Sequence, residues 1–314
     1  MSSTPLDLPP VTVRPAREHR RPARDLLVLL RPHQWVKNLL VVPLPLVHPS
    51  AWNLPSLARL AGAVLIFILA SSVVYVGNDI ADRDRDRRHP VKRHRPIAAG
   101  HVSVALAAGA GCALAALLVV LLAVVSPGLA WPVAGYLALN VLYSVWLKHV
   151  PVVDLFVVVL GFEARIVAGY QAVGSAPSVW LLLCVFFLCL TLILGKRRRE
   201  IDDAGSAHRP ALAGYSAALV DQMLTLSAGL TAVAFLLFLG GDASSAASDN
   251  LATLVLVPLS LFGLFRYLRI LTLQGVDGDP VRALLRDRVI VSTALLSAGL
   301  LAVLLGVDGL GRLS

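Results

Sequence analysis

Four residues with oxygen-bearing side chains follow an apolar run near 57–77. Asn78, Asp79, Asp82 and Asp86 form the pattern Asn-Asp-x-x-Asp-x-x-x-Asp. If the helix continues past the apolar run, this spacing places all four side chains on one side. Stacked carboxylates repel each other beside a low-dielectric wall, and a divalent cation relieves that repulsion. Carboxylate and amide oxygens suit Mg²⁺, so we expect catalytic roles for all four residues and metal ligation by the three aspartates.

The alternative is a solvated run of alternating acids and bases. Four arginines share the stretch, namely Arg83, Arg85, Arg87 and Arg88. We expect Asp84 to point away from the other carboxylates and to join these arginines.

A basic segment stiffened by prolines follows at 89–96, with the sequence HPVKRHRP. Lys92, Arg93 and Arg95 supply cationic donors, and guanidinium groups bind phosphate oxygens in a forked geometry. Acidic and basic groups on one loop suit a ligand that combines a metal ion with phosphate. A pure topology signal is the alternative, but it leaves the adjacent carboxylates unexplained.

Polar residues in or beside other apolar runs complete the candidate site. Charged groups within a span are costly and face the bundle interior, which applies to Asp154, Glu163 and Arg165. Glu163 and Arg165 are two positions apart, so we expect each to find a partner on another helix. The further candidate substrate-binding residues are Lys37, Asn38, Tyr143, Lys148, Arg165, Lys196, Arg197, Glu200, Asp287 and Arg288.

The chain that positions these residues is strongly apolar. Of its 314 residues 57% are hydrophobic and 15% are charged, with a net charge of +9. About a quarter of the residues of a soluble domain are charged, so this composition excludes a soluble globular protein and also disorder. A basic nucleic-acid-binding domain is normally polar, so no nucleic-acid partner is expected. The apolar content suffices for roughly nine transmembrane helices.

We therefore expect an all-α integral membrane bundle of nine transmembrane helices. Residues 1–25 form a basic Pro/Arg-rich tail, and 26–314 form one transmembrane catalytic domain. We interpret 24–37 as an interfacial amphipathic helix ending at Pro32, with the start of the first span as the alternative. The expected spans lie near 38–52, 57–77, 102–125, 129–147, 151–170, 178–195, 217–240, 250–271 and 289–307.

The distribution of basic residues supports this span count. All 28 Lys and Arg except Arg59, Arg165 and Arg312 lie in the N-terminus or after an even-numbered span. The positive-inside rule makes that face cytoplasmic. We expect a multi-pass protein of the cell membrane with its N-terminus and active site in the cytoplasm and its C-terminus outside.

The acidic pattern at 78–86, after the second expected helix, resembles the UbiA-type intramembrane prenyltransferase superfamily. Further strings are similar to the phosphoribosyltransferase branch of that superfamily over about residues 26–306. They are RPHQWVKN at 31–38, HPVKRHRPIAAG at 89–100, YSVWLKH at 143–149, RIVAG at 165–169, GKRRRE at 195–200 and LRDRV at 285–289.

The resemblance implies a nine-helix bundle whose central cavity opens to lipid. It also implies Mg²⁺-dependent transfer of 5-phosphoribosyl from 5-phosphoribosyl diphosphate (PRPP) to a polyprenyl (decaprenyl) phosphate, with release of diphosphate. The product would feed arabinan and arabinogalactan synthesis for the cell wall. The resemblance is compatible with a homo-oligomer and does not specify the length of the polyprenyl chain.

One departure from the superfamily concerns its second acidic motif. Members that take a prenyl diphosphate usually carry Asp-x-x-x-Asp after the sixth helix, where this chain has Lys196-x-x-x-Glu200. The resemblance then implies a cation suited to an additional 5-phosphate and puts a second metal in doubt, unless Asp202 or Asp203 restores it. Two alternatives remain: an aromatic prenyltransferase that uses a prenyl diphosphate, and a lipid transporter. The transporter would predict polar residues near the bilayer midplane and internal repeats.

Overall fold

The computed structural model describes residues 22–42, 53–204, 214–241, 249–273 and 286–311, and these ranges contain helices and no strand. The longer helices are α2 (Leu54–Ala81), α4 (Val104–Val125), α5 (Ala130–Val145), α6 (Val153–Ala172), α7 (Val179–Ala204), α8 (Ala217–Gly241), α9 (Asp249–Leu273) and α11 (Arg288–Gly311). Shorter ones are α1 (Pro22–Leu29), α3 (Arg83–Arg88) and the 3-10 helices η1 (Pro32–Val41), η4 (Lys92–His94), η5 (Pro127–Leu129) and η6 (Leu147–His149).

The chain is a multi-pass membrane protein. Within the described ranges, six helical stretches are long and apolar enough to cross a bilayer: α2, α4, η5 with α5, α7, α8 and α9. Helix α6 covers the expected span 151–170 from Val153 onward, and α11 covers the expected span 289–307. The all-helical prediction is confirmed. Of the first expected span, η1 covers the beginning and residues 43–52 lie outside the described part.

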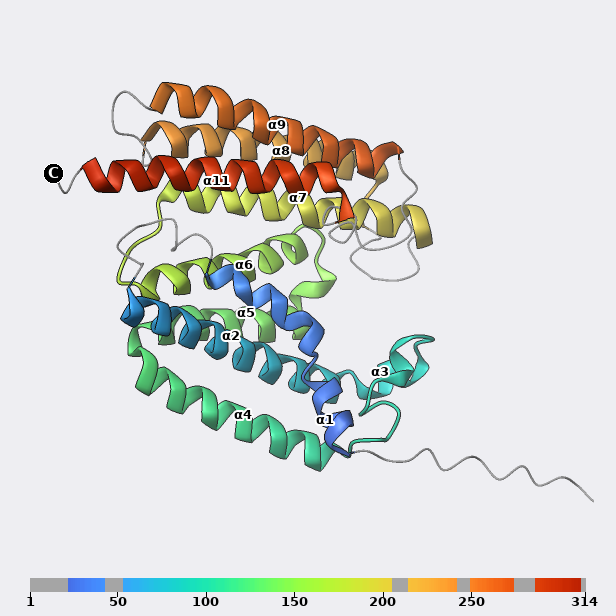
Figure 1. Cartoon of the computed structure of the whole chain (residues 1–314). Coiled ribbons are helices and arrows are strands. Elements are labelled where there is room, and N and C mark those ends of the chain that lie inside the picture. The colour runs from blue at the N-terminus through green and yellow to red at the C-terminus, as the bar shows by residue number, and fades with distance from the viewer. Residues whose placement is uncertain (1–21, 43–52, 205–213, 242–248, 274–285, 312–314) are drawn as a thin grey trace, which may run out of the picture.

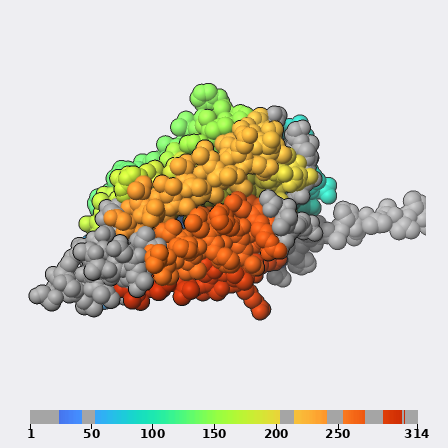
Figure 2. Space-filling view, turned by 90° about the horizontal axis from the view of Figure 1, so that it is seen from above, coloured from blue at the N-terminus to red at the C-terminus, as the bar shows by residue number. Residues whose placement is uncertain are grey.

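Successive long helices run in opposite directions, so that alternate helix ends meet at the two ends of the bundle (Figure 1). Helix α4 packs on α2, α5 on α6, α7 on α8, and α9 on both α8 and α11, while α6 joins the two groups through α7. Figure 2 shows α8 and α9 side by side over one face of the molecule. This alternation brings α3, the C-terminal end of α7 and the beginning of α11 to the same end of the bundle (Figure 1).

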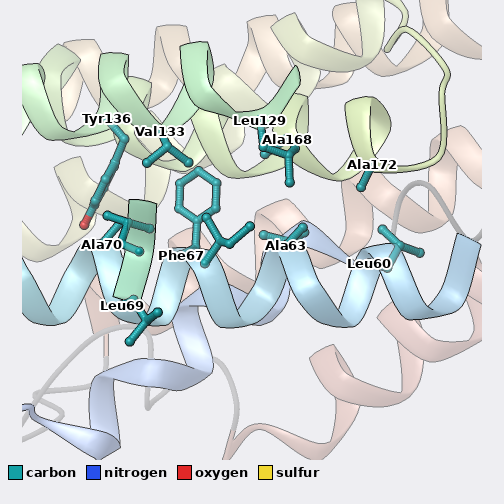
Figure 3. Packing of buried hydrophobic residues seen from close by; sticks show 13 residues of the cluster. Leu60, Ala63, Phe67, Leu69, Ala70, Leu129, Val133, Tyr136, Ala168 and Ala172 are labelled. Carbon is teal, nitrogen blue, oxygen red and sulfur yellow. The ribbon is translucent and has the colours of Figure 1, made fainter. Parts of the chain in front are cut away.

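The packing of α2 explains why this helix can carry the acidic motif rigidly. Leu60, Ala63, Phe67 and Ala70 recur at helical spacing and are buried against α5 and α6 (Figure 3). The Phe67 ring meets the Tyr136 ring edge-on, with centroids 5.5 Å apart. Small residues on this stripe let the helices approach closely, which favours association within a membrane.

Two expectations about helix limits are wrong. Helix α1 ends at Leu29, before the expected limit at Pro32, and Arg31 adopts a left-handed conformation with φ 52°. The residue before a proline disfavours the right-handed helical region, which explains the separate start of η1. Helix α2 ends at Ala81, and Asp82 has φ −90° and ψ 4°, so the acidic motif is divided between two helices.

Candidate active site

Two buried carboxylates face each other across one arginine at the end of the bundle. Asp79 from the last turn of α2 and Asp86 from α3 are each 2% exposed. Arg95 Nη1 donates to Asp79 Oδ1 at 3.1 Å and to Asp86 Oδ2 at 2.7 Å. Buried carboxylates need such charge-assisted partners, because an unpaired buried charge is strongly destabilising.

A second arginine approaches Asp79 from the other side. Arg31 Nη2 donates to Asp79 Oδ1 at 2.5 Å, and its guanidinium lies 5.0 Å from the centroid of the Tyr75 ring. The left-handed turn at Arg31 therefore ties the N-terminal helices to the acidic motif.

After the end of α2, the Asp82 side chain contacts partners other than Arg95. Lys148 Nζ lies 3.5 Å from Asp82 Oδ1, and Arg85 Nη1 also donates to that oxygen at 3.3 Å. Asn78 accepts a hydrogen bond of 2.6 Å from the Ser144 hydroxyl. The expectation that all four motif residues project from one side is thus wrong, because Asn78 and Asp82 contact residues at the end of α5 and in η6, whereas Asp79 and Asp86 share Arg95.

The arginine-rich face of α3 lies outside this arrangement. Asp84 is exposed and pairs with Arg83 at 3.1 Å and Arg87 at 3.4 Å, as expected. The hydrogen bond from Arg83 lowers the pKa of Asp84 below its ordinary value. On the following segment Lys92 and Arg93 are exposed, and Arg93 Nε donates to His94 Nε2. Lys37 is also exposed, and Tyr143 is half-buried near the end of α5.

The basic motif of α7 forms a second buried cluster. Arg197 is 4% exposed and donates to Asp154 Oδ2 at 2.7 Å and to Glu200 Oε2 at 2.6 Å. The Tyr215 hydroxyl donates to Asp154 Oδ1 at 2.7 Å. Burial raises the pKa of Tyr215, so its hydroxyl remains a donor. Arg197 thus neutralises buried acids within the protein, whereas its neighbour Lys196 is exposed.

Arg198 and Asp202 form an ion pair on the outer face of α7. Arg198 also pairs with Asp221 of α8 at 2.8 Å. Asp202 is therefore already engaged, and the side chain of Asp203 lies outside the described part.

Arg165 lies inside the bundle among neutral partners. Its guanidinium donates to Asn38 Oδ1 at 2.9 Å, to Gly161 O at 2.6 Å and to the Ser71 and Tyr136 hydroxyls at 3.3 Å. Arg165 is 5% exposed and its guanidinium is 4.6 Å from the Tyr136 ring centroid. The expected partner on another helix is confirmed for Arg165. For Glu163, Oε1 is buried without a hydrogen-bond partner among the described residues.

Asp287 closes the contact between α9 and α11. Arg266 Nε and Nη2 donate to its two carboxylate oxygens at 2.8 and 2.9 Å. Asp287 Oδ1 also accepts from the backbone N–H groups of Val289 and Ile290 at the start of α11. The hydrogen bond from Arg266 lowers the pKa of Asp287. The next residue, Arg288, is exposed.

The pair Asp79 and Asp86 offers carboxylate oxygens, the ligand type that Mg²⁺ prefers. These oxygens are already bonded to arginine. Asp79 and Asp86 present hard oxygens around a single cationic nitrogen of Arg95. In the part of the chain that the structure describes, no three His, Cys, Asp or Glu side chains converge into a metal-binding group. The donor types therefore fit Mg²⁺, and Asp79 with Asp86 is the pair best placed to hold it.

Several residues of these clusters were not expected from the sequence. Arg31 lies in the RPHQWVKN string, but no signal distinguished it from its neighbours. Ser144, Tyr215 and Arg266 are separated from their partners by 66, 61 and 21 positions. Only the fold brings such pairs together. Asp154 carried a usable signal, since it is a charged residue within an expected span.

The helical bundle and the carboxylate–arginine site at its end define a polytopic membrane protein with a polar site at one end of the bundle. The sequence pattern of the UbiA prenyltransferase family matches residues 50–283, so the chain belongs to this family and is an enzyme of it.

Curated relatives are similar over most of the chain. The decaprenyl-phosphate phosphoribosyltransferase of Corynebacterium glutamicum is 34% identical over 293 residues, which cover 88% of this chain and 86% of the relative. The enzyme of the same name from Mycobacterium tuberculosis is 34% identical over 273 residues, covering 85% and 89%.

Solved structures support the fold. A UbiA homolog from Archaeoglobus fulgidus bound to DMAPP and Mg²⁺ has a TM-score of 0.67 at 18% identity, covering 90% of this chain and 99% of that one. A digeranylgeranylglyceryl phosphate synthase structure has a TM-score of 0.65 at 13% identity, covering 90% and 98%. At these identities the likeness concerns the fold alone.

Proposed function

We propose that this chain transfers the 5-phosphoribosyl group of PRPP to a polyprenyl phosphate, of which decaprenyl phosphate is the expected example, with release of diphosphate. The observation that carries the proposal is the 34% identity to a decaprenyl-phosphate phosphoribosyltransferase over 88% of the chain. The excess of cations around the carboxylates agrees with two phosphate-bearing substrates.

The reaction needs a nucleophile, a leaving group and stabilisation of charge. An oxygen of the lipid phosphate attacks the anomeric carbon of the ribose. The bond from that carbon to the diphosphate oxygen breaks, and the electron pair leaves with diphosphate. The lipid phosphate is already anionic, so no side chain has to remove a proton from it.

Asp79 and Asp86 are the residues that would hold Mg²⁺, whereas the other expected ligands, Asp82 and Asn78, contact Lys148 and Ser144. Bound there, the ion would offset the charge that develops on the leaving diphosphate. The same carboxylates stabilise positive charge that develops at the anomeric carbon.

The cations are placed to bind and orient phosphates. Arg31 and Arg95 lie against Asp79, and Lys148 lies against Asp82. Lys92 and Arg93 are exposed on the adjacent segment. Guanidinium groups orient phosphate oxygens through forked hydrogen bonds, whereas the lysines act as point charges.

We place the site on the cytoplasmic face of the cell membrane, with the C-terminus outside, because the basic residues gather on that side. The product would then be a precursor for arabinan of the cell wall. A phosphatase fused to the C-terminus is expected to be active outside the membrane. Activity of an N-terminal phosphatase fusion instead would contradict this orientation.

The function is tested by donor choice in membranes that contain the chain. One reaction receives labelled PRPP and decaprenyl phosphate, and the other receives a labelled prenyl diphosphate and an aromatic acid. We expect lipid-extractable label from PRPP, with Mg²⁺ required. Transfer of the prenyl group to the aromatic acid, with no product from PRPP, would establish the other activity.

A further inference from the structure

The connection between α5 and α6, residues 146–152, carries a phosphate-binding candidate on a strained backbone. Lys148 lies in this connection, within reach of Asp82. The connection ends at Val152, which has φ 69° and ψ −49°. A β-branched residue is a true outlier at positive φ, and such strain persists only where surrounding contacts hold it.

The contact that holds Val152 comes from a distant part of the chain. The Tyr215 hydroxyl accepts a hydrogen bond of 2.5 Å from the Val152 backbone N–H. The same hydroxyl donates to Asp154 Oδ1 at 2.7 Å, in the first turn of α6. One oxygen therefore joins the strained residue to the beginning of the next helix.

The residue before Tyr215 packs against the same connection. A methyl group added to Gly214 would collide with Pro151 Cγ. The chain at 214–215 thus lies directly on Pro151 and Val152, and only glycine permits this close approach.

The partner of Tyr215, Asp154, is itself held by a buried ion pair. Asp154 is 1% exposed, and its second carboxylate oxygen accepts from Arg197 Nη2 at 2.7 Å. Arg197 in turn donates to Glu200 at 2.6 Å. Tyr215 is therefore held by a buried ion pair on α6 and α7, and it transmits that fixed position to the connection.

We propose that Tyr215 is a positioning residue for the transfer reaction, which holds residues 146–152 so that Lys148 stays beside Asp82. Tyr215 acts through Lys148 and does not touch the substrates. This inference rests on the proposed function, because Lys148 matters only if the carboxylate site binds phosphates.

The test is a double-mutant cycle of Tyr215→Phe and Lys148→Ala, with the KM for PRPP and kcat measured for each protein. Tyr215→Phe is expected to raise the KM about fivefold and to change kcat less than about twofold. In the Lys148→Ala background the same substitution is expected to change the KM less than about twofold. Effects that multiply fully in the double variant would overturn the proposal.

A second variant perturbs the connection without removing the hydroxyl. Gly214→Ala pushes on Pro151 and is expected to raise the KM in the same direction. Tyr170→Phe is the matched control, because Tyr170 is also a buried tyrosine but lies at the far end of α6. An equal rise of the KM in the control would show a general loss of packing and would contradict the positioning role.

Amide hydrogen exchange separates this proposal from the proposed function. Tyr215→Phe is expected to speed exchange in peptides covering 147–155 and to leave the middle of α2 unchanged. If the wild type shows no phosphoribosyl transfer, the proposed function fails, and exchange then decides alone whether Tyr215 holds the connection. Unchanged exchange at 147–155 would overturn the inference in either case.

Discussion

Asp79 and Asp86, which belong to two different helices, share one guanidinium nitrogen of Arg95 at 3.1 and 2.7 Å. A cation between two buried carboxylates relieves their repulsion. A divalent metal ion would relieve it in the same way. The relationship therefore links the structure to the metal chemistry that we propose, and it makes Arg95 a competitor for the metal ligands.

The first prediction concerns the acid held most tightly. Asp79→Asn keeps the shape of the side chain but removes its charge, so we expect kcat/KM to fall by about a hundredfold or more, with expression unchanged. Asp84→Asn is the control, because Asp84 lies on the same motif but is exposed and contacts Arg83 and Arg87. Equal activity of both variants would remove Asp79 from the site.

The second prediction concerns competition between Arg95 and metal. With Arg95 removed, both carboxylates lose a cationic partner that a divalent ion can replace. We expect Arg95→Ala to bind Mn²⁺ about tenfold more tightly than the wild type in the absence of substrates, measured by electron paramagnetic resonance. Arg93→Ala is the control, since Arg93 is exposed and donates to His94. Weaker binding to Arg95→Ala would contradict this account.

The third prediction separates two roles for Arg165. Its hydrogen bonds satisfy Asn38, Ser71 and Tyr136 inside the bundle. Arg165→Leu removes one hydrogen-bond donor from each of these groups, so we expect the free energy of unfolding in detergent to fall by about 2 kcal/mol. Arg59→Leu, at an exposed position of α2, is the control. A raised KM for the lipid phosphate with unchanged stability would instead support direct substrate binding.

The fourth prediction is a pH dependence of stability. Arg266 lowers the pKa of Asp287, so the ionised carboxylate stabilises the fold above the ordinary pKa of an aspartate. That contribution is lost as the pH falls through the lowered value in the folded protein. We expect Asp287→Asn to lower the melting temperature at pH 7. The difference from wild type should persist down to about pH 4 and shrink only as the pH falls further, through the lowered pKa of Asp287.

A companion variant separates charge from helix capping. Asp287 accepts from two backbone N–H groups at the start of α11, and asparagine can still do so. Asp287→Ala loses both contributions, so its free energy of unfolding should fall by about 1 kcal/mol more than that of Asp287→Asn. A constant difference between wild type and Asp287→Asn from pH 7 to pH 3 would contradict the charge effect.

Composition and hydropathy predicted the helical membrane fold because a bilayer admits few other solutions. The spacing of the acidic motif also predicted that Asp79 and Asp86 lie close together. Stacked acidic side chains beside a membrane span repel each other and therefore need a cationic partner. The prediction of one continuous helix through Asp82 was wrong, because α2 ends at Ala81. The ion pair of Asp82 with Lys148 was also not predictable, because it depends on the approach of η6, which local spacing does not encode.

The contacts of Tyr215 were also not predictable from local sequence spacing. It follows no charged motif, and its partners Val152 and Asp154 are 63 and 61 positions away. The roles of Lys37, Lys92, Arg288 and the other expected substrate-binding cations stay predictions, because contacts with a substrate decide them.

The most direct test of the transfer reaction follows the two halves of PRPP separately. The purified protein receives decaprenyl phosphate, Mg²⁺ and PRPP. One PRPP preparation is labelled in the ribose, and the other is labelled in the outer phosphate of the diphosphate group. We predict that the ribose label enters the lipid phase while the phosphate label stays in water as diphosphate, and that with Asp79→Asn both labels stay in water as intact PRPP. Ribose label that remains in the aqueous phase, or both labels together in the lipid, would contradict the proposed transfer.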